Sequence, residues 1–245
     1  MRQIDFDLQK KANQFRNDAG IGLKEPIPFK AIFLKLGIIC VYKDLSGKFS
    51  GMSIKVGENM FILINSCHPI GRQNFTICHE FYHLFMEEHF QSHRCIAGEF
   101  NKQNKTEYNA DRFASYLLMP EDGLLELIPD AELKRKNLIT LTSFLRLEQY
   151  YSCSRTALLY RLSSLGLIDV DKYEEYKNNV SKEAIKHGYD ASIYLPGNKD
   201  LVFGDYGEIA NKLFDNEKIS ESHYAQLMLD IGIDIDMDLT NHDRS

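Results

Sequence analysis

Apolar residues recur every three or four positions between residues 5 and 19, which predicts an amphipathic helix at the start of the chain. Gly20 follows the last apolar position of this pattern and is a common residue at a helix end. Residues 25–28 contain two prolines, which fix their own backbone and restrict the residues before them. The sequence therefore predicts one helix followed by a stiff, extended connector.

Three short runs rich in Ile, Val and Phe follow, at residues 38–42, 51–56 and 60–65. Their length and composition predict three β-strands. Residues 57–59 are Gly-Glu-Asn, a turn sequence that predicts a hairpin between the second and third strands.

Beyond residue 65 the apolar spacing becomes helical and largely remains so. We expect a strong helix over residues 72–89 and another over residues 105–119, stopped by Pro120. The later helices are expected in two pairs, and residues 233–245 are expected to be a frayed polar tail. The predicted pairs lie within residues 138–165, with a break near 152–154, and at residues 206–214 and 220–231. A small early sheet followed by helices indicates the α+β class.

Composition narrows the kind of protein. The chain has 245 residues, of which 44% are hydrophobic and 26% charged, so it is neither disordered nor a coiled coil. The formal net charge of −6 argues against a surface that binds phosphate backbones throughout. The longest apolar stretch, residues 31–42, is too short for a membrane span, and the N-terminus lacks the apolar core of a signal peptide. Five irregularly spaced cysteines indicate free thiols, so we expect a cytoplasmic protein.

One short motif indicates metal chemistry: His79-Glu80-Phe81-Tyr82-His83, an H-E-x-x-H pattern on a predicted helix. The two histidines lie one turn apart, separated by about 40° around the helix axis, so two imidazoles can bind one Zn²⁺. Glu80 projects to the side of His83, where it can act as a general base. The motif therefore predicts metal-assisted hydrolysis.

Two residues could provide a third ligand. His89 stands where one zinc-protease pattern has its third histidine, but Met86 replaces the glycine that lets the chain turn back toward the metal. A helix that continued would leave His89 about 80° from the ligand face. Glu107 is favoured, because Asp111 lies one turn later and can accept the outer N–H of a ligand histidine.

Two motifs together carry a family resemblance. They are residues 75–84, with the sequence Phe-Thr-Ile-Cys-His-Glu-Phe-Tyr-His-Leu, and Glu107-x-x-Ala110-Asp111-x-Phe113-Ala114-x-x-Leu117-Leu118-Met119-Pro120. In this combination the chain resembles the ImmA/IrrE family of bacterial metallopeptidases, closely over residues 31–120 and more loosely to about residue 232.

The resemblance implies a compact gluzincin-like zinc domain with a short β-sheet and an active-site helix. It implies His79, His83 and Glu107 as zinc ligands and Glu80 as the catalytic residue. Members of the family are associated with the cleavage or inactivation of helix-turn-helix repressors in mobile elements and stress responses. The resemblance therefore implies a repressor as the protein substrate.

Tyr82 departs from the family pattern, which usually has glycine before the second histidine. Its ring could narrow a substrate cleft, or its hydroxyl could assist an oxyanion. Packing against the sheet is the favoured interpretation. This departure affects the expected substrate range more than the expected binding of zinc.

Residues 141–150 and 154–162 have the dimensions of a helix-turn-helix, with Ser154 as a natural N-cap. Arg146, Arg155 and Arg161 could face phosphates. A packed helical hairpin is favoured over DNA contact, because the chain as a whole is acidic. The cysteines at 67, 78 and 95 are interpreted as buried or incidental thiols.

We expect a zinc metallopeptidase domain over residues 1–129, a helix-turn-helix-like segment over 130–168, and a helical C-terminal module over 169–232. The predicted function is a zinc-dependent endopeptidase that cleaves one specific partner. The alternative is a non-hydrolytic regulatory protein that uses the zinc fold to bind a repressor or DNA. A structural zinc protein is disfavoured, since H-E-x-x-H places a carboxylate beside an open metal position.

Overall fold

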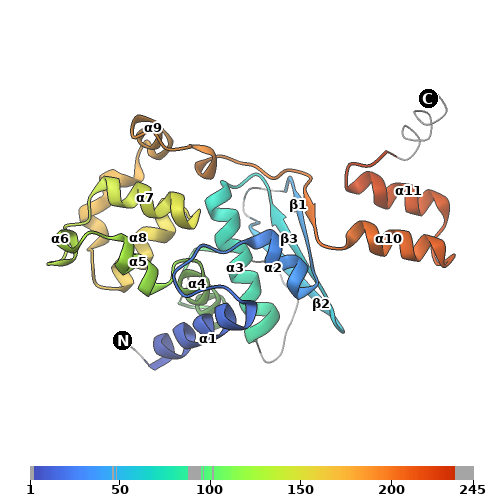
Figure 1. Ribbon diagram of the computed structural model, residues 1–245, viewed down its shortest axis with the longest axis horizontal. Coiled ribbons are helices and arrows are strands. Elements are labelled where there is room, and N and C mark those ends of the chain that lie inside the picture. Colours follow the sequence, from blue (N-terminus) through green and yellow to red (C-terminus); the bar gives the residue numbers. More distant parts are fainter. Residues whose placement is uncertain are drawn as a thin grey trace.

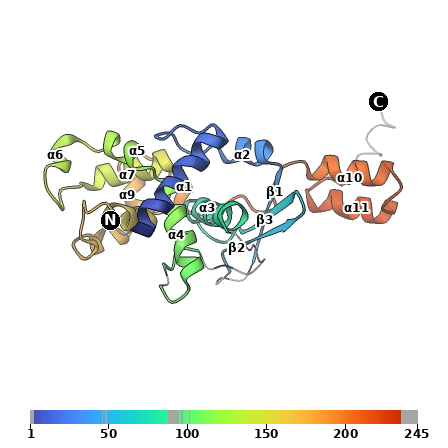
Figure 2. The ribbon, with the colours of Figure 1, turned by 90° about the horizontal axis from the view of Figure 1, so that it is seen from below.

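The computed structural model describes residues 3–45, 47, 49–87, 95, 97–100 and 102–234. It combines a small four-stranded sheet with many helices, so the predicted α+β class is confirmed (Figures 1 and 2). Within these residues, every helix is too short or too polar to cross a membrane.

The sheet has the order β2-β3-β1-β4. β2 (Gly51–Val56) and β3 (Asn59–Asn65) form the predicted antiparallel hairpin, and β3 runs parallel to β1 (Ile38–Lys43). The fourth strand, β4 (Val202–Phe203), pairs antiparallel with β1 although it lies far downstream in the chain. Two residues are too few to form a strand pattern, which explains why the sequence did not predict β4.

Three helices and the sheet form the part of the fold that carries the candidate residues. α3 (Ile70–Met86) packs against β2 and β3 on one side and against α4 (Lys105–Leu118) on another. α1 (Gln3–Ala19) packs on α4 in turn (Figure 1). Because neighbours cover it on several sides, α3 buries every side chain from Gln73 to Leu84.

One helix was not predicted, and the end of another differs from the prediction. α2 (Phe29–Leu36) was not expected, because its eight residues overlap the apolar stretch that leads into β1. α3 ends at Met86 instead of His89, since Glu87 already has an extended backbone. His89 itself lies outside the described residues.

The later helices include both predicted pairs, together with further short helices that were not predicted. α7 and α8 are the pair expected within residues 138–165, and the side chain of Ser154 caps α8 by accepting a hydrogen bond from the Ala157 amide. The last pair, α10 and α11, is also confirmed. The elements are α5 (Glu121–Leu127), α6 (Asp130–Leu133), α7 (Leu141–Tyr151), α8 (Arg155–Ser164), η1 (Val170–Lys177), α9 (Val180–Lys186), η2 (Ser192–Tyr194), α10 (Tyr206–Asp215) and α11 (Glu221–Asp230).

The arginines of the α7–α8 pair do not behave as the DNA-contact alternative requires. Arg155 is buried and paired with the buried carboxylate of Glu148. Arg161 is buried as well, and its Nε donates to the backbone carbonyl of Met119 at 3.0 Å. The suggestion that these two side chains face phosphates is therefore wrong, and only Arg146 of the three is exposed.

The segment just before β4, residues 195–197, is hydrogen-bonded to the start of α3. The Ile70 amide donates to the carbonyl of Leu195 at 3.0 Å, and the Gln73 side chain donates to that of Gly197 at 2.9 Å. The chain then enters β4, beyond which α10 and α11 extend away from the other helices (Figure 1). Residues 169–232 thus contribute a strand to the sheet, and the division into modules stays a prediction.

Candidate active site

The predicted site residues lie on two faces of α3. His79 and His83 face α4, whereas Glu80 faces β2. All three side chains are almost completely buried. The 100° step between neighbouring helical residues separates the carboxylate from the histidines, as the motif predicted.

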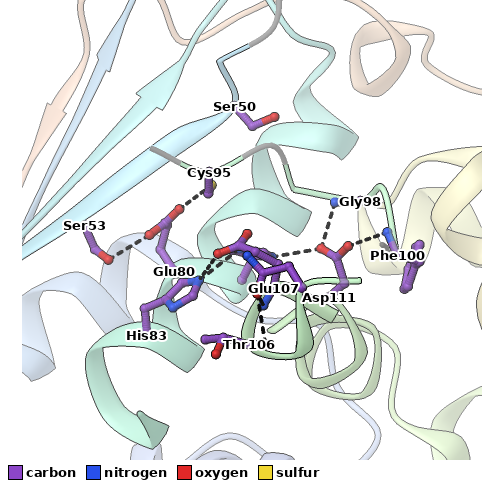
Figure 3. A network of polar contacts seen from close by, with 12 residues as sticks. Ser50, Ser53, Glu80, His83, Cys95, Gly98, Phe100, Thr106, Glu107 and Asp111 are labelled. Carbon is purple, nitrogen blue, oxygen red and sulfur yellow. Dashed lines mark hydrogen bonds and ion pairs between the residues drawn. The ribbon is translucent and has the colours of Figure 1, made fainter. Parts of the chain in front are cut away.

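Three side chains converge between α3 and α4. The Nε2 atoms of His79 and His83 are 3.1 Å apart. The Glu107 carboxylate lies 3.2 Å from Nε2 of His79 and 3.5 Å from Nε2 of His83. Glu107 is in the first turn of α4, which begins there because the Asn104 side chain caps it. The structure therefore brings together the three residues that the sequence selected as candidate ligands. Two of them, His83 and Glu107, are labelled in Figure 3.

The outer nitrogen of each histidine is held by a carboxylate. Nδ1 of His79 lies 2.8 Å from Oδ1 of Asp111, and Nδ1 of His83 lies 2.8 Å from Oε2 of Glu87. Asp111 is fixed by two further hydrogen bonds, because it accepts the amides of Gly98 and Phe100 at 2.7 Å each (Figure 3). Asp111 was predicted in this position. Glu87 was missed, although its spacing of four residues from His83 was a readable signal.

This arrangement fits a cation. With both Nδ1–H groups donated to carboxylates, the neutral rings of His79 and His83 turn two Nε2 lone pairs toward each other and toward Glu107. Lone pairs 3.1 Å apart repel each other unless a proton or a metal ion lies between them. Two imidazoles and one carboxylate are also the ligand set of many catalytic zinc sites.

The pKa shifts agree with a single positive charge at this point. Burial lowers the pKa of His79, but its hydrogen bonds to Asp111 and Glu107 oppose burial, and the pKa lies well above its ordinary value. Burial and the neighbouring His79 lower the pKa of His83. One of the two rings thus retains a proton, which a divalent cation can replace.

The Glu80 carboxylate is held at both oxygens. The Ser53 hydroxyl in β2 donates to Oε2 at 2.7 Å, and the Cys95 thiol donates to Oε1 at 2.6 Å (Figure 3). Neither partner was identified from the sequence. Cys95 reaches Glu80 only because its backbone pairs with Gly51 at the start of β2, a long-range contact without a local pattern.

The five cysteines are free thiols, as predicted, but their environments differ. Cys67 is exposed, whereas the other four are buried. Burial and the Glu80 carboxylate raise the pKa of Cys95 to about 12. In the metal-free chain Cys95 is therefore a protonated thiol at neutral pH.

Tyr82 lies on the α4 side of α3. Its ring centroid is 5.7 Å from that of Phe113 and 5.7 Å from that of His83. The expected packing partner was the sheet, whereas the observed one is α4. The ring is buried beside a candidate ligand, and a role for Tyr82 in substrate selection stays a prediction.

Comparisons with known proteins agree with this geometry. Residues 35–163 match the family model described as the IrrE N-terminal-like domain, a peptidase family of the zinc type. The matched region includes α3, α4 and each candidate ligand. A search of curated proteins found no match. Because the family model covers more than half of the chain, the chain belongs to the zinc peptidase family of the IrrE N-terminal-like domain.

Proposed function

We propose that this chain is a zinc-dependent endopeptidase that cleaves one specific protein partner, a helix-turn-helix transcriptional repressor. Family membership supports peptide hydrolysis. The observation that carries the proposal is the convergence of His79, His83 and Glu107 beside a buried, doubly held Glu80. The choice of a repressor rests on the association of the ImmA/IrrE family with such substrates.

His79, His83 and Glu107 would hold the zinc. When bound, the metal supplies Lewis-acid polarisation of the scissile carbonyl and of the attacking water. The carboxylates of Asp111 and Glu87 accept the outer N–H of each histidine, which fixes the ring orientation and the tautomer.

Glu80 would transfer protons. Its carboxylate takes a proton from the attacking water and then delivers that proton to the leaving amine. In the metal-free chain Ser53 and Cys95 hold its two oxygens, so the carboxylate has one orientation there. Burial of Glu80 between α3 and β2 also limits competing access of bulk water.

The test is the Glu80→Gln variant, with the exposed Glu58→Gln as a matched control. Each zinc-loaded protein is incubated with a helix-turn-helix repressor encoded beside its gene, and fragments are identified by mass spectrometry. We expect one or two cleavage sites with the unmodified chain and with Glu58→Gln. Glu80→Gln should keep its zinc and lose about 10²–10⁴-fold in rate, the usual contribution of a general base.

A different outcome would favour the non-hydrolytic alternative. If the repressor is inactivated without new fragments, and Glu80→Gln inactivates it equally well, the chain acts by docking. Loss of zinc from Glu80→Gln would instead place the metal in the neighbouring cluster of His79, Glu80 and Cys95.

A further inference from the structure

We propose that Cys95 is a fourth ligand of the metal in the resting chain and closes the position at which substrate would bind. The proposal rests on the zinc site proposed above. It begins from the anchored position of Cys95. The Cys95 amide donates to the carbonyl of Gly51 at 3.0 Å, and the Ser50 amide donates to the carbonyl of Cys95 at 3.1 Å. These two hydrogen bonds hold the residue against the start of β2.

The thiol points into the candidate site. Cys95 is buried, and Figure 3 shows its side chain directed at Glu80. The donor atoms of His79, Glu80 and Cys95 all lie within 4.8 Å of one another, as do those of His79, His83 and Glu107. His79 belongs to both sets, so the sulfur lies close to one of the proposed ligands and to Glu80.

The free coordination position of the proposed zinc site is expected on the side of Glu80. A tetrahedral zinc with three protein ligands has one free position, which in a hydrolase lies next to the general base. The sulfur of Cys95 is 2.6 Å from Oε1 of Glu80 and therefore occupies the neighbourhood of this position. The hydrogen bond to Glu80 alone would not make it a ligand, but His79 also belongs to the group of donor atoms that contains this sulfur.

The chemistry of ligation is simple. Thiolate is among the strongest protein ligands for zinc, and a coordinating thiol is deprotonated on binding. The S–H bond breaks, a sulfur–metal bond forms, and the proton leaves to solvent. No oxidant or further reactant is needed. The consequence is a closed, latent centre, in which a substrate carbonyl must displace the sulfur before hydrolysis begins.

Cobalt substitution tests the ligand directly. Co²⁺ takes the place of Zn²⁺ in the full-length chain, and a bound thiolate gives a charge-transfer absorption band in the near ultraviolet. We expect this band in the unmodified chain at one cobalt per chain. It should disappear in Cys95→Ser and in Cys95→Ala, and persist in the control Cys67→Ser, whose thiol is exposed.

The outcomes separate this proposal from the proposed function. One bound cobalt with visible d–d bands but no charge-transfer band in the unmodified chain would overturn the role of Cys95 and leave the zinc site intact. A band that persists in Cys95→Ser would assign the sulfur to another cysteine and would also overturn it. Failure to bind cobalt at all would overturn both the proposed role of Cys95 and the proposed zinc peptidase function. The spectrum of the unmodified chain decides the first point even if a variant does not fold.

Discussion

Both histidines of the candidate site and Glu80 are oriented by hydrogen bonds to neighbouring side chains. Asp111 holds His79, Glu87 holds His83, and in the metal-free chain Ser53 with Cys95 holds Glu80. A side chain held in this way does not have to be ordered during binding or catalysis, so less conformational entropy is lost at that step. The partners behind the ligands should therefore influence metal affinity even though they do not touch the metal.

Replacing Asp111 by asparagine tests this influence. The variant weakens the hydrogen bond to His79 and disturbs the amides of Gly98 and Phe100. We expect the zinc affinity to fall by about 10–100-fold, the usual effect of losing such a partner. Competition with a chromophoric chelator measures it, and the exposed Asp122→Asn serves as the control. A change below about twofold would mean that Asp111 does not orient the ligand.

The third ligand can be tested by comparing Glu107→Ala with His89→Ala. Glu107 lies within 3.5 Å of both Nε2 atoms, so its removal should weaken zinc binding more than Asp111→Asn does. Because α3 ends at Met86, the helix-angle argument against His89 does not apply, and this comparison is the decisive evidence. Zinc lost from His89→Ala and retained by Glu107→Ala would reverse the assignment.

Local spacing explains which of these residues could be predicted. His79, Glu80 and His83 share one helix, so their relative positions follow from its geometry. Cys95 and Ser53 reach Glu80 only through the pairing of distant segments, which no local pattern records.

At the level of elements, the N-terminal turn of α3 lies directly against the turn between α7 and α8. The Asn74 side chain donates to the Ser152 carbonyl at 2.9 Å. A Cβ on Gly71 would lie 2.8 Å from the carbonyl carbon of Cys153 and 2.8 Å from the Ser154 amide nitrogen. The helical pair thus supports the helix that carries both histidines.

Gly71→Ala should therefore destabilise the fold. Its methyl group would meet backbone atoms that cannot rotate away, and overpacking of this kind costs about 1–3 kcal/mol. Urea unfolding measures the loss. Gly47→Ala is the matched control, because none of the described residues lies within 4 Å of its added Cβ. Equal stability of the two variants would mean that α3 does not rest closely on this turn.

The elements also show where sequence patterns stop being informative. The hairpin and the later helical pairs were predicted correctly, because turn residues and caps mark them. α2 was missed inside an apolar stretch, and the burial of Arg155 and Arg161 was missed because their partners come from other segments. A basic residue on a helix does not reveal whether it faces solvent or a buried carboxylate.

For the whole molecule, the stabilisation of the fold by zinc should depend on pH. In the metal-free chain the pKa of His79 lies well above its ordinary value of about 6.5. The folded chain therefore binds a proton that the unfolded chain has lost, and its stability falls as pH rises from about 6.5 toward the raised pKa. His83, whose pKa is lowered, is neutral in both states over this window.

Zinc replaces the proton on His79, so the loaded chain lacks this loss of stability. The difference in melting temperature between zinc-loaded and chelator-treated protein should widen as pH rises above about 6.5. Differential scanning calorimetry across this range measures it. A difference that is constant or shrinks with pH would show that zinc does not compete with the His79 proton.

The sheet, α3 and α4 together present one site at which two histidines, a glutamate and a general base meet. An anomalous difference map at the zinc absorption edge, from crystals of the full-length chain, would locate the metal without assuming its ligands. We predict a single strong peak bonded to Nε2 of His79, Nε2 of His83 and the Glu107 carboxylate. A peak elsewhere, or one that leaves out Glu107, would contradict the proposed zinc peptidase site.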